Sequence, residues 1–143
     1  MTTPRAKRKF LAVMLFLTLP ICLAAEPVVD ILKIAGKSKS EVESVLGKPT
    51  KTSKSKYGEK CTYKTGETEI VFIKGKADWI TVEGVDELPF NERTIKSIGL
   101  KEAKTVHKTE WEMRWEKIQG LLSVSLFKGE KKSDYFYIKV KTK

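Results

Sequence analysis

Apolar residues recur along this chain with two spacings, one typical of helices and one typical of strands. The helical spacing is clearest between residues 40 and 47, where every third or fourth side chain is apolar. These apolar residues are Val42, Val45 and Leu46. Ser40 and Glu43 have the spacing of an N-terminal capping box, and Gly47 suits a helix end. The pattern predicts a short helix that needs a surface to pack on.

A second helix is predicted after residue 90. Asn91 is a good N-cap, and Gly99 suits the C-terminal end. Ile95 and Ile98 form a small apolar face between these ends. A still shorter helix, ending at Gly36, is expected before residue 40, with an extended lead-in as the alternative.

Strand patterns follow each of the two main helices. The predicted strands are residues 60–64, 67–73 and 78–82 in the first half and 110–116, 121–127 and 135–140 in the second. Residues 48–60 are polar and are expected to form a loop with a ragged first strand. Short connections that contain Gly predict antiparallel hairpins between the runs. Each helix therefore precedes a three-stranded antiparallel meander.

The two halves also match in short segments. Residues 79–82 match 137–140, and residues 72–76 match 126–130, where both copies carry a Lys-Gly turn. Duplication explains the agreement, although two similar meanders can also arise by chance from strand composition.

From this order we expect an α+β fold made of tandem helix-plus-antiparallel-meander units. The first unit covers residues 26–84 and the second covers residues 85–143. Side by side, the units would form one continuous antiparallel sheet with both helices on one face and a shared core.

Residues 1–25 have the pattern of a secretory signal peptide. Basic residues at positions 5, 7, 8 and 9 precede an apolar run that ends in small residues at 24 and 25. This run is shorter than the ~20 residues that span a bilayer, although an uncleaved anchor is an alternative. Lipidation of Cys22 is a further alternative. The pattern predicts a periplasmic or secreted protein.

Charge narrows the choice of partners. The chain has 28 Lys and Arg against 18 Asp and Glu, a formal charge of +10, and loss of the four basic residues of the signal leaves +6. A moderately basic exported domain can meet an acidic protein face or an anionic lipid or polymer surface. A solvated, Lys-rich surface without a partner is also consistent with this charge. Nucleic acid is not expected for an exported chain.

The number of cysteines limits which disulfides the mature chain can form. Cys61 is the one cysteine left after cleavage, so the mature chain has no internal disulfide. Cys61 falls in a strand pattern, which favours a buried thiol over an intermolecular bridge.

Residues 39–49, with the sequence Lys-Ser-Glu-Val through Val-Leu-Gly-Lys-Pro, resemble the helix-to-strand signature of the SmpA/OmlA (BamE-like) family. The duplicated helix-plus-meander order resembles the β-lactamase-inhibitor-protein (BLIP) family. These resemblances imply an exported, non-catalytic α+β domain that works by protein contact. The chain departs from BamE-like members by its second unit, and from BLIP-type inhibitors by lacking internal disulfides. No inhibitory residue is matched onto this sequence.

The sequence contains no pattern typical of an active site. His107 is the one histidine and has no Ser or Cys at motif spacing. No Cys/His pair or acidic run has metal-ligand spacing, and no Gly-rich phosphate loop occurs. We therefore predict a protein that is not an enzyme, without catalytic residues, metal or cofactor.

Aromatic residues are the better candidates for a site. Trp111, Met113 and Trp115 alternate on one strand face and are expected to pack beneath the helices. The opposite face of the sheet is expected to carry Trp79, Tyr135 and Tyr137, with Arg114 as a basic neighbour. This composition is typical of protein-binding hot spots. The alternative is that these rings only cover the sheet or pack on a loop.

The predicted function is an exported, inhibitor-like protein-binding module of the cell envelope that uses the helix-free sheet face. The alternative is a BamE-like envelope structural or outer-membrane assembly protein. In that case the Lys-rich loops would contact anionic lipid or polymer.

Overall fold

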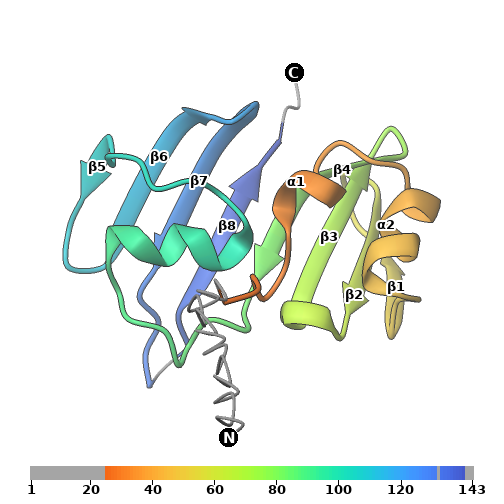
Figure 1. Ribbon diagram of the computed structural model, residues 1–143. Helices are drawn as coiled ribbons and strands as arrows, with labels where there is room; N and C mark the ends of the chain where they lie inside the picture. Colours follow the sequence, from red (N-terminus) through yellow and green to blue (C-terminus); the bar gives the residue numbers. More distant parts are fainter. Residues whose placement is uncertain (1–24, 132, 141–143) are drawn as a thin grey trace, which may run out of the picture.

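In the part of the chain that the structure describes, eight antiparallel strands form one open sheet, and short helical segments pack on one side of it (Figure 1). The structure is a computed structural model that describes residues 25–131 and 133–140. The predicted signal peptide and Cys22 lie outside the described residues, apart from Ala25. The α+β class and the antiparallel sheet predicted from the sequence are confirmed.

The first half of the chain contains α1 (Ile31–Ile34), α2 (Lys39–Leu46), β1 (Lys51–Lys54), β2 (Glu59–Tyr63), the 3₁₀ turn η1 (Thr65–Glu67), β3 (Thr68–Ile73) and β4 (Lys76–Val82). The second half contains the 3₁₀ helix η2 (Glu92–Ile98), β5 (His107–Lys108), β6 (Glu112–Ile118), β7 (Leu121–Phe127) and β8 (Tyr135–Lys139).

Each half therefore has four strands where the sequence predicted three. The additional strands, β1 and β5, lie at the two edges of the sheet. Edge strands have a hydrogen-bonding partner on one side only and are short and charged in many proteins, since this protects the edge. Their polar sequences carry no apolar alternation, so no strand was predicted for β5 and only a ragged one near β1.

The strand order is β1-β2-β3-β4-β8-β7-β6-β5, so the two halves meet along β4 and β8. Ile80 pairs directly with Ile138 at this junction. A two-fold rotation about an axis through the Ile80–Ile138 pair exchanges the two flanking pairs, which are Trp79 with Lys139 and Thr81 with Tyr137. The two strands that meet here are those whose sequences match.

The same relation extends outward through the sheet. In the first half Ile70 pairs with Ile80, and in the second Val124 pairs with Ile138. At the edges, the pair Ser53–Lys60 corresponds to the pair His107–Arg114. The halves therefore share one strand topology and one register, while their origin by duplication and the boundary at residue 84 stay predictions.

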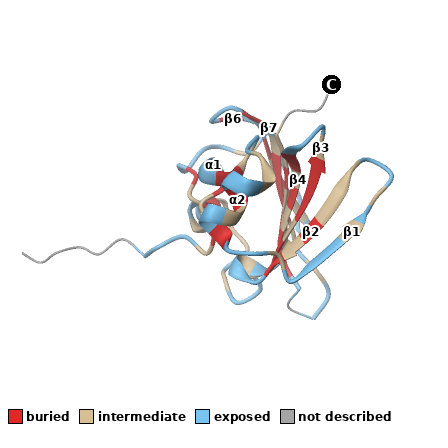
Figure 2. Ribbon diagram, turned by 90° about the vertical axis from the view of Figure 1, so that its right-hand side faces the viewer, coloured by how far each residue is buried: buried red, intermediate tan, exposed pale blue. Residues whose placement is uncertain are grey.

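A hydrophobic core lies between the helical segments and the sheet. Ile31 of α1, Val42 of α2 and Ile95 of η2 are all fully buried in it, together with the inward side chains of the strands. Figure 2 shows this layering, with the buried parts of α2, β3 and β4 facing one another. Trp115 is the largest buried side chain, and its Nε1 donates a hydrogen bond to the Ala103 carbonyl at 2.9 Å.

The cap of α2 differs from the prediction. Ser38, not Ser40, is the N-cap, and the Glu41 carboxylate accepts a hydrogen bond from the Ser38 amide at 2.8 Å. That hydrogen bond lowers the pKa of Glu41. Ser38-Glu41 and Ser40-Glu43 have the same spacing, but Ser38 also forms a β-bridge with Lys76. The bridge holds Ser38 in the extended conformation that an N-cap requires.

Replacing Ser38 by Ala should lower the free energy of unfolding by about 1 kcal/mol, because the capping box is lost. The matched control is Ser40→Ala, which should change it by less than about 0.5 kcal/mol. Urea unfolding of both variants measures the difference. Equal losses at the two positions would show that Ser38 is not the functional cap.

Two further details of the helices and strands depart from expectation. Val45 is exposed, since α2 buries Val42 and Leu46 instead. Trp111 is also exposed, at 57%. It precedes β6, in a turn where its amide donates to Thr109 Oγ1 at 3.2 Å, so it does not continue the alternation that buries Met113 and Trp115.

Other details are confirmed. η2 begins after Asn91, whose side chain accepts from the Arg93 amide, and ends at Gly99 in the left-handed region with φ of +80°. Cys61 is fully buried and forms no disulfide within the described residues. Burial raises the pKa of its thiol.

Cys61 should react with Ellman's reagent very slowly in the native protein and at the normal rate in urea, because the thiolate is both shielded and disfavoured. The colour change at 412 nm follows the reaction. Fast labelling of the folded chain at Cys61 would contradict the burial.

Candidate binding face of the sheet

The face of the sheet that points away from the helical segments is called the outer face. Along β4, β6 and β8, residues of the outer face alternate with the buried core residues. All four predicted site residues lie on it: Trp79, Arg114, Tyr135 and Tyr137. Each is partly exposed. Their placement follows the strand period of two, as the sequence indicated.

Five aromatic side chains gather on the outer face and are called the aromatic stripe. They are Tyr57, Trp79, Tyr137, Tyr135 and Phe127. The Tyr57 and Trp79 rings lie 4.5 Å apart between centroids, at an angle of 56°. The Phe127 and Tyr135 rings are stacked at 5.2 Å. Tyr137 is on β8 with Tyr135, so the stripe crosses the centre of the sheet.

Tyr137 lies near Tyr57 and Asp78. Its phenol pKa is raised, first by partial burial and then by the neighbouring Asp78 carboxylate and Tyr57. Like other tyrosines, Tyr137 is protonated at neutral pH and can donate a hydrogen bond to a bound partner.

Two members of the stripe were not predicted. Phe127 is the last residue of β7 and lies on the same face of the strand as Ser123 and Ser125. Strand alternation could therefore have predicted its place on the outer face. Tyr57 lies in the loop between β1 and β2, where no periodicity exists. No sequence pattern could have placed it against Trp79.

Tyr57 reaches the outer face because the β1–β2 hairpin bends that way. Figure 2 shows this hairpin on the far side of β3 and β4 from the helices. Ser55 closes the turn, since its backbone amide donates to the Gly58 carbonyl at 2.7 Å and its hydroxyl accepts from the Tyr57 and Gly58 amides. A Cβ on Gly58 would lie 1.9 Å from the Phe72 carbonyl oxygen, so only glycine fits this approach.

Arg114 is already engaged by carboxylates of its own strand. Its guanidinium lies 3.9 Å from Glu112 and 3.6 Å from Glu116. Glu112 also lies 3.9 Å from His107 and accepts from Ser125 Oγ at 3.1 Å. Such exposed ion pairs contribute little stability. They do neutralise Arg114, so a partner would meet a paired side chain there.

The hairpin end of the stripe is basic. Lys139 Nζ lies 5.1 Å from the centre of the Trp79 ring, and Lys56 Nζ lies 5.6 Å from that of Tyr57. The hairpin carries further lysines at 51, 54 and 60. Its one acidic residue, Glu59, pairs with Lys39, and this pair lowers the pKa of the Glu59 carboxyl.

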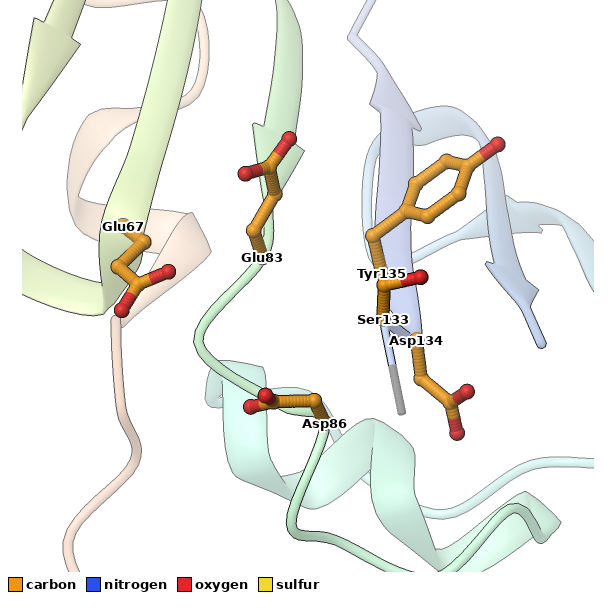
Figure 3. Close-up of a pocket in the computed structure, with 6 residues that line it drawn as sticks. All are labelled: Glu67, Glu83, Asp86, Ser133, Asp134 and Tyr135. Carbon is orange, nitrogen blue, oxygen red and sulfur yellow. The ribbon is translucent and has the colours of Figure 1, made fainter. Parts of the chain in front are cut away.

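The other end of the stripe is acidic. Tyr135 borders a pocket of about 320 Å³ with several carboxylates around it (Figure 3). Its lining residues are Glu67, Glu83, Asp86, Ser133, Asp134 and Tyr135. Asp134 accepts a hydrogen bond from the Gly129 amide at 3.1 Å, a contact that closes its own loop. In the described part of the chain, no three His, Cys, Asp or Glu side chains are close enough to hold a metal ion.

Comparisons with known proteins give one distant likeness. No family model matches the chain, and no curated protein matches it significantly. One similar solved structure is an extracellular protein containing an SCP domain from Bacillus anthracis str. Ames, at 13% identity and a TM-score of 0.48. The match covers 82% of this chain and spans about half of that one, at 47%. A likeness this distant indicates no function.

The length and composition of the helices bear on whether any of them could span a membrane. Among residues 25–131 and 133–140, no helix has the length and apolar character needed to cross a bilayer.

Proposed function

We propose that this protein is an exported, non-catalytic protein-binding module of the cell envelope that docks a partner on the outer face. The observation that carries the proposal is the aromatic stripe. Five partly or well exposed rings lie together on the sheet face that the helical segments leave uncovered. Clusters of Trp and Tyr at the centre of a face are the residues that dominate binding energy in protein interfaces.

The architecture supports an inhibitor-like mode of binding. Helices on one face secure the sheet through the core, so the outer face is presented as a rigid surface. Rigid surfaces bind without a large ordering cost. The resemblance of the sequence to BLIP-like and BamE-like proteins implies an exported, non-catalytic domain that works by protein contact.

Capture from an envelope extract tests this function. The immobilised protein is compared with the double variant Trp79→Ala/Tyr137→Ala and with Val45→Ala, a matched truncation of an exposed side chain on α2. We expect the same proteins on wild type and Val45→Ala, their loss from the double variant, and retention in roughly 0.5 M NaCl. A folded double variant that captures the same proteins as wild type would contradict the proposal.

A second candidate is an envelope structural or assembly protein that touches anionic lipid or polymer. The exposed lysines of the β1–β2 hairpin favour it. Binding of this kind depends on charge and should fade as salt rises, whereas binding through the aromatic stripe should persist. Flotation with anionic vesicles at low and high salt separates the two candidates.

A further inference from the structure

Trp79 carries a polar group that the described residues do not satisfy. Its Nε1 is buried, and no acceptor among residues 25–131 and 133–140 lies within hydrogen-bond distance. Leaving a buried donor unpaired is unfavourable, because the group has lost its hydrogen bonds to water. A ligand that supplies an acceptor would replace those hydrogen bonds.

The Tyr57 ring packs against this indole at a tilted angle. The centroids of the Tyr57 and Trp79 rings are 4.5 Å apart, while 52% of the Tyr57 residue is exposed. The hairpin backbone is fixed by the Ser55 turn and by the approach of Gly58 to β3. The exposed ring can turn aside by rotating about its own side-chain bonds, which takes nanoseconds or less. The Tyr57 ring can therefore move while the backbone of the hairpin stays in place.

Two lysine ammonium groups lie beside the Trp79 and Tyr57 rings. Lys139 lies over the Trp79 ring and Lys56 lies over the Tyr57 ring. Of the carboxylates near this face, Glu69 pairs with Lys60 at 3.2 Å, while Asp78 is buried and lies near Tyr137. An acceptor that brings a negative charge fits this setting better than a neutral one.

We propose that Trp79 is the hydrogen-bond donor of a docking site for an acidic segment of a partner protein. A side-chain carboxylate of that segment accepts from Trp79 Nε1 when the Tyr57 ring turns aside, and Lys139 and Lys56 pair with the segment's charges. The inference rests on the proposed function, because it uses the same face, and it adds the chemistry of the partner and the role of Tyr57.

The experiment uses ¹⁵N-labelled protein and a capped hexaglutamate peptide as the probe, followed by the indole N–H resonances in NMR spectra. Trp79→Phe identifies the Trp79 peak by its loss. We expect hexaglutamate to move the Trp79 indole proton downfield in a saturable way, with Trp111 and Trp115 unmoved. Hexaglutamine should leave all three in place.

Variants then separate the parts of the site. Lys139→Gln should weaken hexaglutamate binding about threefold, while the matched control Lys33→Gln on α1 should not change it. Tyr57→Ala should tighten binding about threefold, because no ring has to be displaced. Tyr57→Phe, which keeps the ring, should behave as wild type.

Several results would overturn the inference. They are an unmoved Trp79 indole at saturating hexaglutamate, an equal response to hexaglutamine, weaker binding by Tyr57→Ala, or a shift produced only by anionic vesicles. The proposed function has its own test, because capture that depends on Trp79 and Tyr137 can succeed when hexaglutamate does not bind. That combination would retain the outer face as a docking surface and reject an acidic partner.

Discussion

Replacing Trp115 by Ala should lower the free energy of unfolding by about 3–5 kcal/mol. The side chain is 1% exposed and fills the core between η2 and the sheet. Its loss leaves a cavity and removes the donor that satisfies the Ala103 carbonyl. Denaturant unfolding followed by circular dichroism measures the change.

The control for this prediction is the other tryptophan of the same segment. Trp111 is 57% exposed, so Trp111→Ala should change stability by about 0.5 kcal/mol or less. If the two variants lost similar stability, the assignment of Trp115 to the buried face of β6 would be wrong.

Replacing Trp79 by Ala should weaken binding of the captured partner by about 2 kcal/mol, or roughly 30-fold. The indole contributes both ring area and the unpaired donor, and it lies beside Tyr57, Lys139 and Tyr137. Surface plasmon resonance with the purified partner gives the affinity. Most of the change should appear as faster dissociation.

Val45→Ala serves again as the control, since it truncates an exposed apolar side chain on the helical side. Its affinity should equal that of wild type. A Trp79→Ala protein that is folded and binds as tightly as wild type would remove the aromatic stripe from the interface.

The stripe also implies an orientation for the bound partner. Its hairpin end is surrounded by lysines, and its other end meets the carboxylates beside Tyr135. A partner with an acidic and a basic patch would therefore dock in one direction, because the reverse direction brings like charges together.

Strand alternation made much of this face predictable. Tyr135 and Tyr137 alternate with Phe136 and Ile138, and a period of two leaves only one choice once the buried set is known. The match between residues 79–82 and 137–140 then placed Trp79 on the same side. Local signals also placed Asn91 and Gly99 at the ends of the second helix.

The features that could not be predicted from the sequence depend on contacts between segments that are far apart in the chain. Ser38 and Ser40 are equivalent by spacing, and the bridge from Ser38 to Lys76 decides between them. Tyr57 lies on Trp79 because the hairpin bends across the sheet, which no local pattern encodes. The edge strand β5 is two residues long, and its pairing with β6 is the reason it is extended.

Site-specific photo-crosslinking in cells tests most directly whether the outer face is the docking surface. A benzophenone amino acid is placed at Tyr137 on the outer face, at Val45 on α2, and at Leu32 on α1 as a second exposed apolar control. The account predicts a discrete crosslinked protein from position 137 and none from positions 45 and 32. Crosslinks to the same protein from the helical positions, with none from position 137, would contradict it.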